Sequence, residues 1–399
     1  MTSVPARAWP APSRGTPDED VEWQGFELPG LVRIRLVGAD RGQTAVVAGQ
    51  LGLEPRPLSG DADITIRFVE RLSLAEPVRY VGLDAGYAGD AFLVLRGRHK
   101  QRARVQVPLD AVGGACEITC ERGVSAVPLL LAIVNLTVLG KGSLPVHGSA
   151  FRHRGRGVLV TGWAKGGKTE ALLGFAAHGA EYVGDEWIYL DADRMRGIPE
   201  PIRLWDWHLQ QMPSCWGKLP RSRRASLLAL RRSSALLSWV GILGRRAARW
   251  TDRAVALVDS QRYAHVSPRD LFGAACGGEA PLDQVFLMTT RAGGPVTVGP
   301  ADPDEVAERM AISIEEERAP LVSFYRRFRF AFPDRRNPLL ERAAEIERER
   351  LRQFLRGKEC GVVSHAYPPS ISDIYAALRP VVEREGQVRP EPHWSTHTR

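Results

Sequence analysis

The stretch GVLVTGWAKGGKT, residues 157–169, decides which fold we expect for this chain. It begins as a short apolar, β-branched run, which is typical of a buried strand, and it ends in a turn rich in glycine. The part from Gly162 to Thr169 satisfies G-x-x-x-x-G-K-[ST], the pattern of a phosphate-binding loop. In such a loop the glycines let backbone N–H groups converge on a phosphate. The lysine places a charge on the terminal phosphates, and the hydroxyl binds Mg²⁺.

The residues that flank the loop support the same interpretation, because the pattern is meaningful only between a strand and a helix. Residues 157–161 predict the strand, and residues 170–179 predict an amphipathic helix that ends at a glycine. Residues 182–190 predict a second strand, interrupted by the acidic pair Asp185-Glu186. A glycine-rich turn that binds nothing would not explain why a lysine, a threonine and two carboxylates occur together. The sequence therefore predicts a nucleotide site.

Candidate binding residues lie in the loop and at the start of the helix that follows it. The free N–H groups of a helix N-terminus favour the same anion as the loop. We expect Lys168 to act in catalysis as well as in binding, and we expect Thr169 to share Mg²⁺ with the acidic pair. The residues expected to contact the nucleotide are Gly162, Lys165, Gly166, Gly167, Lys168, Thr169 and Glu170.

Length and composition are those of an ordinary globular protein. The 399 residues suffice for two domains or three small ones, and the apolar share of 44% allows a sizeable core. The formal charge of +8 favours acidic partners, such as a nucleotide, an acidic peptide, anionic lipid or nucleic acid. The five scattered cysteines fit reduced thiols better than a zinc site. We see no secretory signal and expect a cytoplasmic protein.

Changes in composition divide the chain into parts. Residues 1–24 and 386–399 predict flexible tails. Between residues 25 and 123 short β-type runs alternate with turn residues, which predicts a small β-rich domain. Residues 124–385 would form the domain that holds the phosphate-binding loop. A basic helical insertion at about 207–255 interrupts that second domain.

The remaining segments supply the elements of the two domains. Residues 124–139 form the most apolar stretch, but it contains polar residues and is shorter than the roughly 20 residues of a membrane span, so we expect a buried helix. Residues 144–151 predict a strand, and residues 152–156 predict the hairpin turn after it. Further expected strands are 32–36, 64–68, 91–95, 282–288 and 361–365, and further expected helices are 302–314, 341–356 and 372–382.

The insertion is unusual in its charge. No acidic residue occurs between Asp206 and Asp252, whereas apolar residues there interleave with cations at helical spacing. A solvated helical surface would explain this pattern, and so would a clamp for an acidic substrate or a helix that lies on a membrane surface. The cations are Lys218, Arg221, Arg223, Arg224, Arg231, Arg232, Arg245, Arg246 and Arg249.

From His147 to about Trp205 the chain resembles the catalytic domain of HPr kinase/phosphorylase and its wider family of P-loop kinase-like proteins. The resemblance rests on a strand with a histidine, the GVL run before the loop, the GKT triplet, the ALL run of the next helix, and the acidic pair before an apolar strand. It implies an α/β fold, in which an HPr kinase-like, P-loop kinase-like nucleotide-binding domain is preceded by the small β-rich domain.

The resemblance also implies roles for individual residues. In that family an aspartate takes the proton from a substrate serine hydroxyl, and by position this role falls to Asp185. Glu186 matches a second acidic residue that is associated with Mg²⁺, and His147 is placed near the phosphates. A lone histidine is as often a core or turn residue. Because Glu186 stands where the family usually has Asp, and because 195–199 only loosely follows the family's downstream signature, the resemblance implies a divergent member with an acceptor other than HPr.

Three classes of function stay open on the sequence alone. The first is a kinase that uses Mg²⁺ and ATP or GTP to phosphorylate a serine-type hydroxyl of a peptide, a protein or a small molecule. The second is a regulatory or assembly protein that binds nucleotide and phosphorylates nothing, as a monomer or a homo-oligomer. The third is a basic module, switched by nucleotide, that binds a membrane surface or, with less support, nucleic acid. Asp185 favours the kinase, because binding alone does not need a base.

Overall fold

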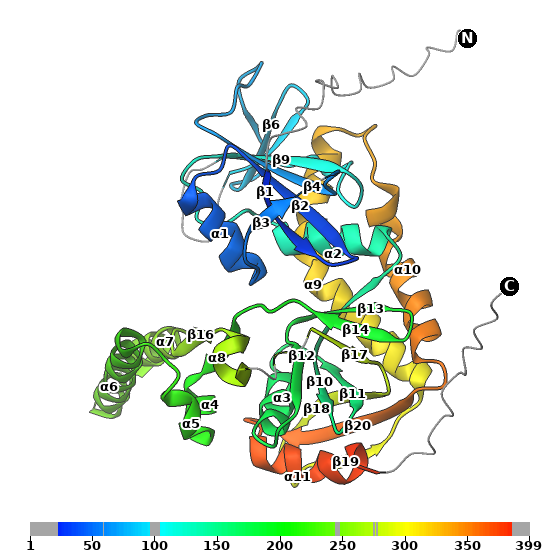
Figure 1. Ribbon diagram of the computed structural model, residues 1–399. Coiled ribbons are helices and arrows are strands. Elements are labelled where there is room, and N and C mark those ends of the chain that lie inside the picture. The colour runs from blue at the N-terminus through cyan, green and yellow to red at the C-terminus, as the bar shows by residue number, and fades with distance from the viewer. Residues whose placement is uncertain are drawn as a thin grey trace, which may run out of the picture.

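The computed structural model describes residues 23–58, 60–95, 104–243, 248–273, 276 and 278–384. This part of the chain is a mixed α/β structure with two large sheets, which Figure 1 shows as two lobes joined by long helices. Residues 1–22 and 385–399, which make up nearly all of the predicted tails, lie outside it. Trp23 and Gln24 belong to the first strand, β1 (Trp23–Leu28), so the predicted N-terminal tail is too long.

The first lobe is built on a nine-stranded sheet. Its further strands are β2 (Val32–Val37), β3 (Arg56–Leu58), β4 (Ile64–Val69), β5 (Arg79–Tyr80), β6 (Ala85–Ala88), β7 (Ala91–Val94), β8 (Val105–Gln106) and β9 (Cys116–Glu121). They lie in the order β3-β1-β2-β4-β9-β8-β7-β6-β5, in which β2, β4 and β9 are parallel. The strands expected near 32, 64 and 91 are confirmed, and in β2 and β4 every second residue is buried, as the alternating pattern predicts.

One helix of this lobe was missing from our expectation. Helix α1 (Arg41–Leu51) follows β2 and makes the connection toward the parallel strand β4. Asp40 caps it, because its carboxylate accepts from the backbone N–H of Gln43 while the Gln43 side chain accepts from the backbone N–H of Asp40. The lobe is therefore β-rich but not all-β.

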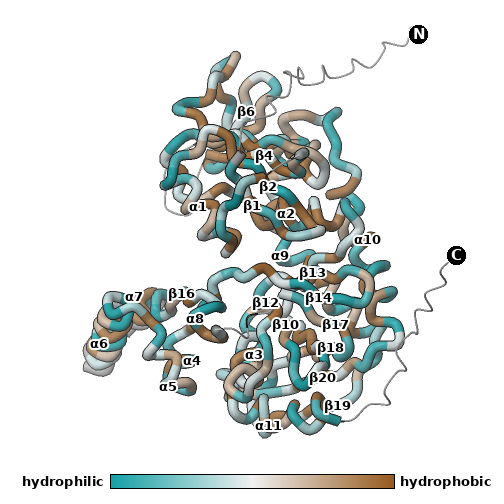
Figure 2. The backbone as a smooth tube through the Cα atoms, in the orientation of Figure 1, coloured by the Kyte–Doolittle hydropathy of each residue, from teal (hydrophilic) through white to brown (hydrophobic). Residues whose placement is uncertain are grey.

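Helix α2 (Leu130–Gly140) begins later than the predicted start at residue 124. Pro128 disfavours a helical conformation at the residue before it, and Leu129 has a left-handed φ of 63°. The helix itself is buried between the lobes, and Figure 2 shows its apolar character. Among the described residues, no helix is both long enough and apolar enough to cross a membrane.

The second lobe is built on a second large sheet. Its strands are β10 (Leu144–His153), β11 (Arg156–Gly162), β12 (Glu181–Gly184), β13 (Trp187–Asp191), β14 (Arg194–Gly197), β17 (Glu279–Pro281), β18 (Gln284–Arg291), β19 (Thr297–Pro300) and β20 (Glu359–Ala366). They follow the order β17-β14-β13-β10-β11-β18-β20-β19, with β12 also paired to β10. The hairpin between β10 and β11 turns at Arg154 and Gly155, both with positive φ, inside the predicted turn. Strands β11, β18 and β20 are parallel.

Helices cover both faces of the second sheet. They are α3 (Lys168–Ala176), α9 (Pro303–Ala331), α10 (Pro338–Leu355) and α11 (Ile371–Val382). Successive residues of β11 alternate between two cores, since Leu159 packs with α2, α9 and α10, whereas Val158 and Val160 pack with α3 and α11. The first of these cores continues without a break into the first lobe.

The far end of α9 belongs spatially to the first lobe. The Phe328 ring packs edge-on against Phe92, with their centroids 5.7 Å apart. Beyond α9, the Arg335 guanidinium binds the Asp110 carboxylate, and the Asn337 amide donates to the Leu109 carbonyl oxygen. Residues that the sequence assigned to the second domain thus complete the core of the first.

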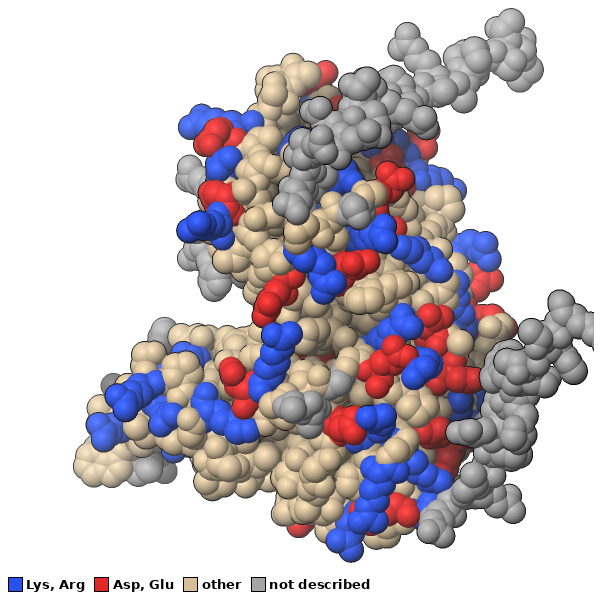
Figure 3. Space-filling view, in the orientation of Figure 1, with Lys and Arg blue, Asp and Glu red and all other residues tan. Residues whose placement is uncertain are grey.

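The basic insertion is helical, as predicted. It comprises α4 (Asp206–Gln211), α5 (Pro213–Trp216), α6 (Arg221–Leu243) and α7 (Ala248–Asp259), framed by the paired strands β15 (Ile202–Trp205) and β16 (Tyr263–Val266) and followed by α8 (Pro268–Phe272). Helices α6 and α7 project from the second lobe as an arm, along which Figure 3 shows Lys and Arg side chains. Arg245 and Arg246 lie outside the described residues, as does the side chain of Arg249.

Candidate functional site

The loop Gly162–Thr169 connects β11 to α3, as the sequence predicts, although α3 already begins at Lys168. Gly162 has a φ of 142° and Gly167 a φ of 99°, a region that side chains rarely adopt. A Cβ at Gly167 would lie 2.7 Å from Nε2 of His365, which itself contacts the Gly166 carbonyl oxygen at 2.8 Å. The loop is thus held tightly from behind by the end of β20.

The loop opens at the N-terminus of α3. Gly167 is the N-cap residue and has no side chain, so no side chain caps the first N–H groups of the helix. The Lys168 side chain is buried and donates to the carbonyl oxygens of Gly162 at 3.2 Å and Trp163 at 2.9 Å. Burial lowers the pKa of Lys168, while the surrounding carboxylates oppose that shift. These donors form a concave site suited to an anion.

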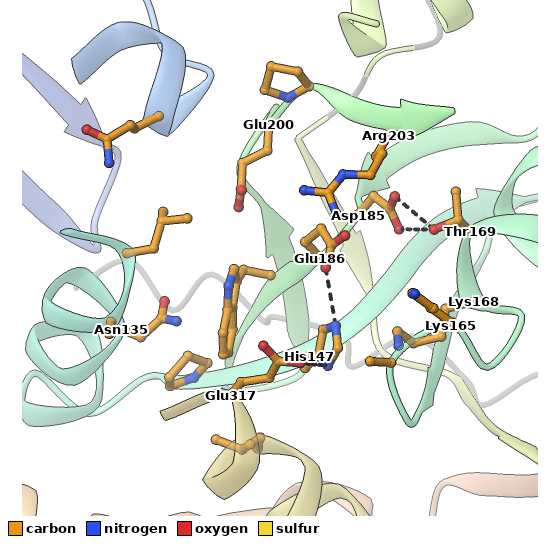
Figure 4. A pocket seen from close by; sticks show the side chains of 18 of the residues that line it. Asn135, His147, Lys165, Lys168, Thr169, Asp185, Glu186, Glu200, Arg203 and Glu317 are labelled. Atoms are coloured by element: carbon orange, nitrogen blue, oxygen red, sulfur yellow. Dashed lines mark hydrogen bonds and ion pairs between the residues drawn. The ribbon is translucent and has the colours of Figure 1, made fainter. Parts of the chain in front are cut away.

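The acidic pair lies in a break between two strands rather than within one. We expected one strand over 182–190 that the acidic pair interrupts, and the structure has two strands there, β12 and β13, which both pair with β10 and leave Asp185 and Glu186 between them. The backbone turns there, and Glu186 has a φ of 70°. Figure 4 shows Asp185 directed at Thr169 of the loop and Glu186 directed at His147.

Asp185 is buried and faces the loop. Its carboxylate accepts from Thr169 Oγ1, at 3.1 Å to Oδ2 and 3.3 Å to Oδ1, and from the Ser149 hydroxyl. Burial first, and then the charge of Glu186, raises the pKa of Asp185 to about 7, although the two hydroxyls and Lys168 favour the ionised form. Ser149 gave no signal in the sequence, because it faces Asp185 only through the pairing of β10 with β12.

His147 lies between two carboxylates. Its Nε2 is 3.2 Å from Oε2 of Glu186, and its Nδ1 is 3.3 Å from Oε1 of Glu317 on α9. The hydrogen bond with His147 lowers the pKa of Glu186, and the charges of Lys168 and Arg203 contribute to that shift. The structure therefore brings His147 to Glu186 of the acidic pair, and it adds Glu317, which the sequence did not indicate.

Two expected nucleotide contacts are engaged elsewhere. The Glu170 carboxylate is buried and lies 2.6 Å from Nε2 of His208 on α4, whose Nδ1 accepts from the Trp205 backbone N–H. His208 must therefore donate through Nε2. Lys165, with a φ of 61°, places its ammonium 5.5 Å from the centre of the Trp205 ring. Glu170 thus ties α3 to the root of the arm instead of presenting a free carboxylate to a ligand.

All the predicted site residues that carry side chains line or border one cavity of about 900 Å³. Figure 4 shows Lys165, Lys168 and Thr169 on one side of this cavity, with Asp185, Glu186 and His147 beside them. Glu200 and Arg203 also line it, and Arg203 is exposed. Glu200 comes from the short connection between β14 and β15, which contains two prolines and has no recognisable pattern, and Arg203 comes from β15 itself.

The residues present fit Mg²⁺ in the company of phosphates. Within the described chain no group of three or more His, Cys, Asp or Glu side chains could hold a metal on its own. Mg²⁺ is commonly held by one or two carboxylates together with substrate phosphates and water. The Thr169 hydroxyl and the Asp185 carboxylate, already in contact, offer that kind of partial oxygen site.

Comparison with known proteins supplies no identity. No protein-family model matches the chain, and no curated protein sequence matches it. The geometry of the site is therefore the basis for a proposed function.

Proposed function

We propose that the protein is a kinase that transfers the γ-phosphoryl group of ATP or GTP to a serine-type hydroxyl of a peptide, a protein or a small molecule. The observation that carries the proposal is the contact between Asp185 and Thr169. It places a buried carboxylate beside the phosphate-binding residues, within one cavity. A kinase needs both parts in one place, namely a cradle for the triphosphate and a base for the hydroxyl.

The loop supports the binding half of this proposal. The backbone N–H groups at the start of α3 would surround the β-phosphate, and Lys168 would leave its carbonyl partners to reach the terminal phosphates. Thr169, Asp185 and Glu186 would hold Mg²⁺, which neutralises charge on the β- and γ-phosphates when it is bound. Arg203 supplies a further cation on the opposite side of the acidic pair.

Asp185 supports the chemical half. The acceptor oxygen would attack the γ-phosphorus while the bond to the β–γ bridging oxygen breaks, and the hydroxyl proton would pass to Asp185. A carboxyl whose pKa lies at about 7 is well matched to this task near neutral pH. His147, held by Glu317, would keep the Glu186 carboxylate ionised and oriented. A protein that only bound nucleotide would need neither arrangement.

The test is phosphoryl transfer from γ-labelled Mg-ATP to a pool of serine-containing peptides, with water as a second acceptor. We expect Asp185→Asn to bind Mg-ATP but to transfer phosphate more slowly, by a factor on the order of 10²–10⁴, as for a lost general base. Asp191→Asn, on β13 but away from the cavity, is the matched control. Turnover of the Asp185→Asn variant close to that of the wild-type protein would show that the base lies elsewhere.

A further inference from the structure

The cavity does not end at the acidic pair. It continues toward the first lobe, where Gln50 of α1, the segment 126–132 and Trp187 line it. Figure 4 shows Asn135 and Glu200 on the far side of Glu186 from Lys168. The loop Gly162–Thr169 occupies one end of the cavity, so the end between the lobes is the part that remains for an acceptor.

Glu200 is the most unusual residue at this end. Its side chain is half-buried, but its Oε1 is fully enclosed and has no hydrogen-bond partner among the described residues. A buried oxygen of this kind destabilises the protein unless it gains a partner. Burial, together with the charges of Glu186 and Asp185, holds the pKa of the Glu200 carboxyl well above its usual range. A cationic ligand would favour the ionised form of this carboxyl and would bring the donor that its Oε1 lacks.

The first lobe fixes Glu200 in place. Gly52 ends α1 with a φ of 65°, and a Cβ there would lie 2.3 Å from the Pro199 carbonyl oxygen and 2.7 Å from Cα of Glu200. Nearby, the Arg196 guanidinium donates to the Pro29 carbonyl oxygen at 3.1 Å. The backbone that carries Glu200 is thus pressed directly against the end of α1, so the first lobe positions this side chain.

The charges at this end favour a cation. Glu186, Glu200 and Glu317 line it together with the exposed Arg203, whereas Arg318 is already engaged by the buried carboxylate of Glu347, so carboxylates outnumber the available cation. Asn135 is more than nine-tenths buried, and its Oδ1 accepts from the Tyr189 hydroxyl. Its amide nitrogen makes no hydrogen bond within the described part of the chain. The lining thus offers three carboxyl groups as acceptors, and the Asn135 amide and the Arg203 guanidinium as donors.

We propose that the end of the cavity between the lobes is the acceptor site and that Glu200 selects a hydroxyl acceptor that carries an ammonium or guanidinium group close to the hydroxyl. This inference rests on the proposed kinase function. A cation would give the enclosed Oε1 its missing donor and would offset the excess of carboxylates around it. The first lobe would then contribute to specificity, because it closes the site and holds Glu200.

The experiment measures binding, so that it does not depend on turnover. The full-length protein is saturated with the Mg²⁺ complex of a non-hydrolysable ATP analogue and titrated calorimetrically with three pools of serine hexapeptides. The residues that flank the serine are lysine or arginine in the first pool, norleucine in the second and glutamate in the third. We expect the cationic pool to bind about tenfold more tightly than the norleucine pool, as one added charged hydrogen bond would give. The acidic pool should bind most weakly.

The variants assign this preference to one residue. Glu200→Gln should reduce the preference for the cationic pool to less than about threefold while nucleotide affinity stays unchanged, and Glu200→Asp should retain part of it. Glu316→Gln, which removes an exposed carboxylate next to Glu317, is the matched control and should bind like the wild type. Thermal unfolding of each variant shows that the comparison concerns folded protein.

Several outcomes would overturn the inference. They are equal binding of the three pools, tighter binding of the acidic pool, an unchanged preference in Glu200→Gln, and a wild-type protein that binds the Mg-nucleotide analogue but no pool. If the wild-type protein does not bind the analogue at all, the proposed kinase function fails instead, so the two failures are distinguishable.

Discussion

Asp185 is the residue on which the proposed proton transfer depends. It contacts a hydroxyl of β10 and a hydroxyl of α3, and it stands next to Glu186 in a turn that the strand pairing of β10 creates. A free, solvated aspartate would be ionised throughout the neutral range and would be a weak base. Burial changes this, because it raises the pKa of Asp185 to about 7 and thereby makes its carboxylate a stronger proton acceptor.

A pH profile tests this assignment. Asp185 must be ionised to accept a proton, so kcat/KM for phosphoryl transfer should fall about tenfold per pH unit below a midpoint of about 7. The Lys168 ammonium stays charged over this range only if nearby carboxylates offset its burial, so Mg-ADP affinity should be measured over the same range as a control. A profile that is flat from pH 6 to pH 8 would contradict the role of Asp185.

Lys168 should decide nucleotide binding. Lys168→Ala removes the only ammonium that the loop buries among the described residues, so the thermal stabilisation by Mg-ATP should disappear. Without nucleotide the variant should unfold at a similar temperature, because Lys168 binds only carbonyl oxygens of its own loop. Lys141→Ala, which removes an exposed ion pair with Asp63, is the control and should keep the stabilisation. Full stabilisation of the Lys168 variant would refute the nucleotide site.

The sequence indicated those residues of the site that are neighbours in the chain. The loop and the acidic pair follow one another with a recognisable spacing, so Lys168, Thr169 and Asp185 could be predicted. Three other residues could not be predicted, because tertiary packing brings them to the site. Ser149 reaches Asp185 from β10, Glu200 reaches the cavity from the link between β14 and β15, and Glu317 reaches it from α9.

At the scale of elements, the junction of β11 and α3 depends on two glycines in unusual conformations. Gly167→Ala would place a methyl group 2.7 Å from Nε2 of His365 at a φ of 99°, so the loop would have to move. We expect it to weaken Mg-ATP binding at least about tenfold, since a displaced N–H group no longer faces the phosphate.

Gly179→Ala is the matched control for this variant. Gly179 follows the same helix and also has a positive φ, 84°, but a Cβ there meets nothing within 4 Å. It should lose about 1–2 kcal/mol of stability through its backbone conformation alone and should keep its nucleotide affinity. Isothermal titration with Mg-ATP and denaturant unfolding separate the two effects. Equal nucleotide affinity in both variants would show that the loop tolerates a side chain at residue 167.

Helices and strands could be predicted where one local sequence pattern, such as the spacing of apolar residues, is clear. The strands and helices after residue 280 are present, because their apolar periodicity is regular. Helix α9 nevertheless runs on to Ala331, well beyond the predicted end at residue 314, although it contains Pro320. The proline lies on an exposed face of the helix, where the carbonyl group it leaves unpaired can reach water. The capping box of Asp40 and Gln43 indicates the start of α1 in the sequence. We did not predict this helix, because the segments around it have the pattern of strands.

At the scale of the whole molecule, the two lobes share one hydrophobic core and one cavity. From the sequence we placed a domain boundary at residue 123, because the composition changes there. In the structure, one hydrophobic core contains residues from both sides of this boundary. Helices α2, α9 and α10 fill the space between the sheets, and the end of α9 packs on the first lobe. A pattern along the chain cannot report such contacts, because they join residues that are far apart in the sequence, such as Phe92 and Phe328.

The arm combines structural and free cations. Three arginines expected to meet a partner instead stabilise the arm, since Arg223 and Arg224 donate to backbone carbonyl oxygens and Arg231 binds the buried Asp206 carboxylate. By contrast, Arg221, Arg232 and Arg253 are exposed. Any attraction of an anionic partner must therefore come chiefly from this second group among the described residues.

A charge-reversal experiment addresses the arm as a capture surface. Arg221, Arg232 and Arg253 are changed together to Glu, and binding of a fluorescent acidic peptide is measured by anisotropy at several salt concentrations. The wild-type protein should bind this peptide on the arm, apart from the cavity with its carboxylates, and should lose affinity with salt, because the Debye length falls from about 10 Å at 0.1 M to about 3 Å at 1 M. The variant should bind at least about tenfold more weakly, with unchanged affinity for Mg-ATP, because the arm projects away from the lobes.

The control must carry the same change in net charge at other positions. Reversal of the exposed Arg41, Arg71 and Arg326 fulfils this condition, and it should leave peptide binding within about threefold of the wild type if the effect is local to the arm. Equal losses in the two triple variants would mean that only the net charge matters. If the arm variant instead keeps peptide binding but no longer binds vesicles of anionic lipid, the arm is a membrane-surface element, to which the exposed Leu236 and Trp239 on α6 would contribute. If it keeps both, the arm is a solvated surface, and recognition of the acceptor is confined to the cavity between the lobes.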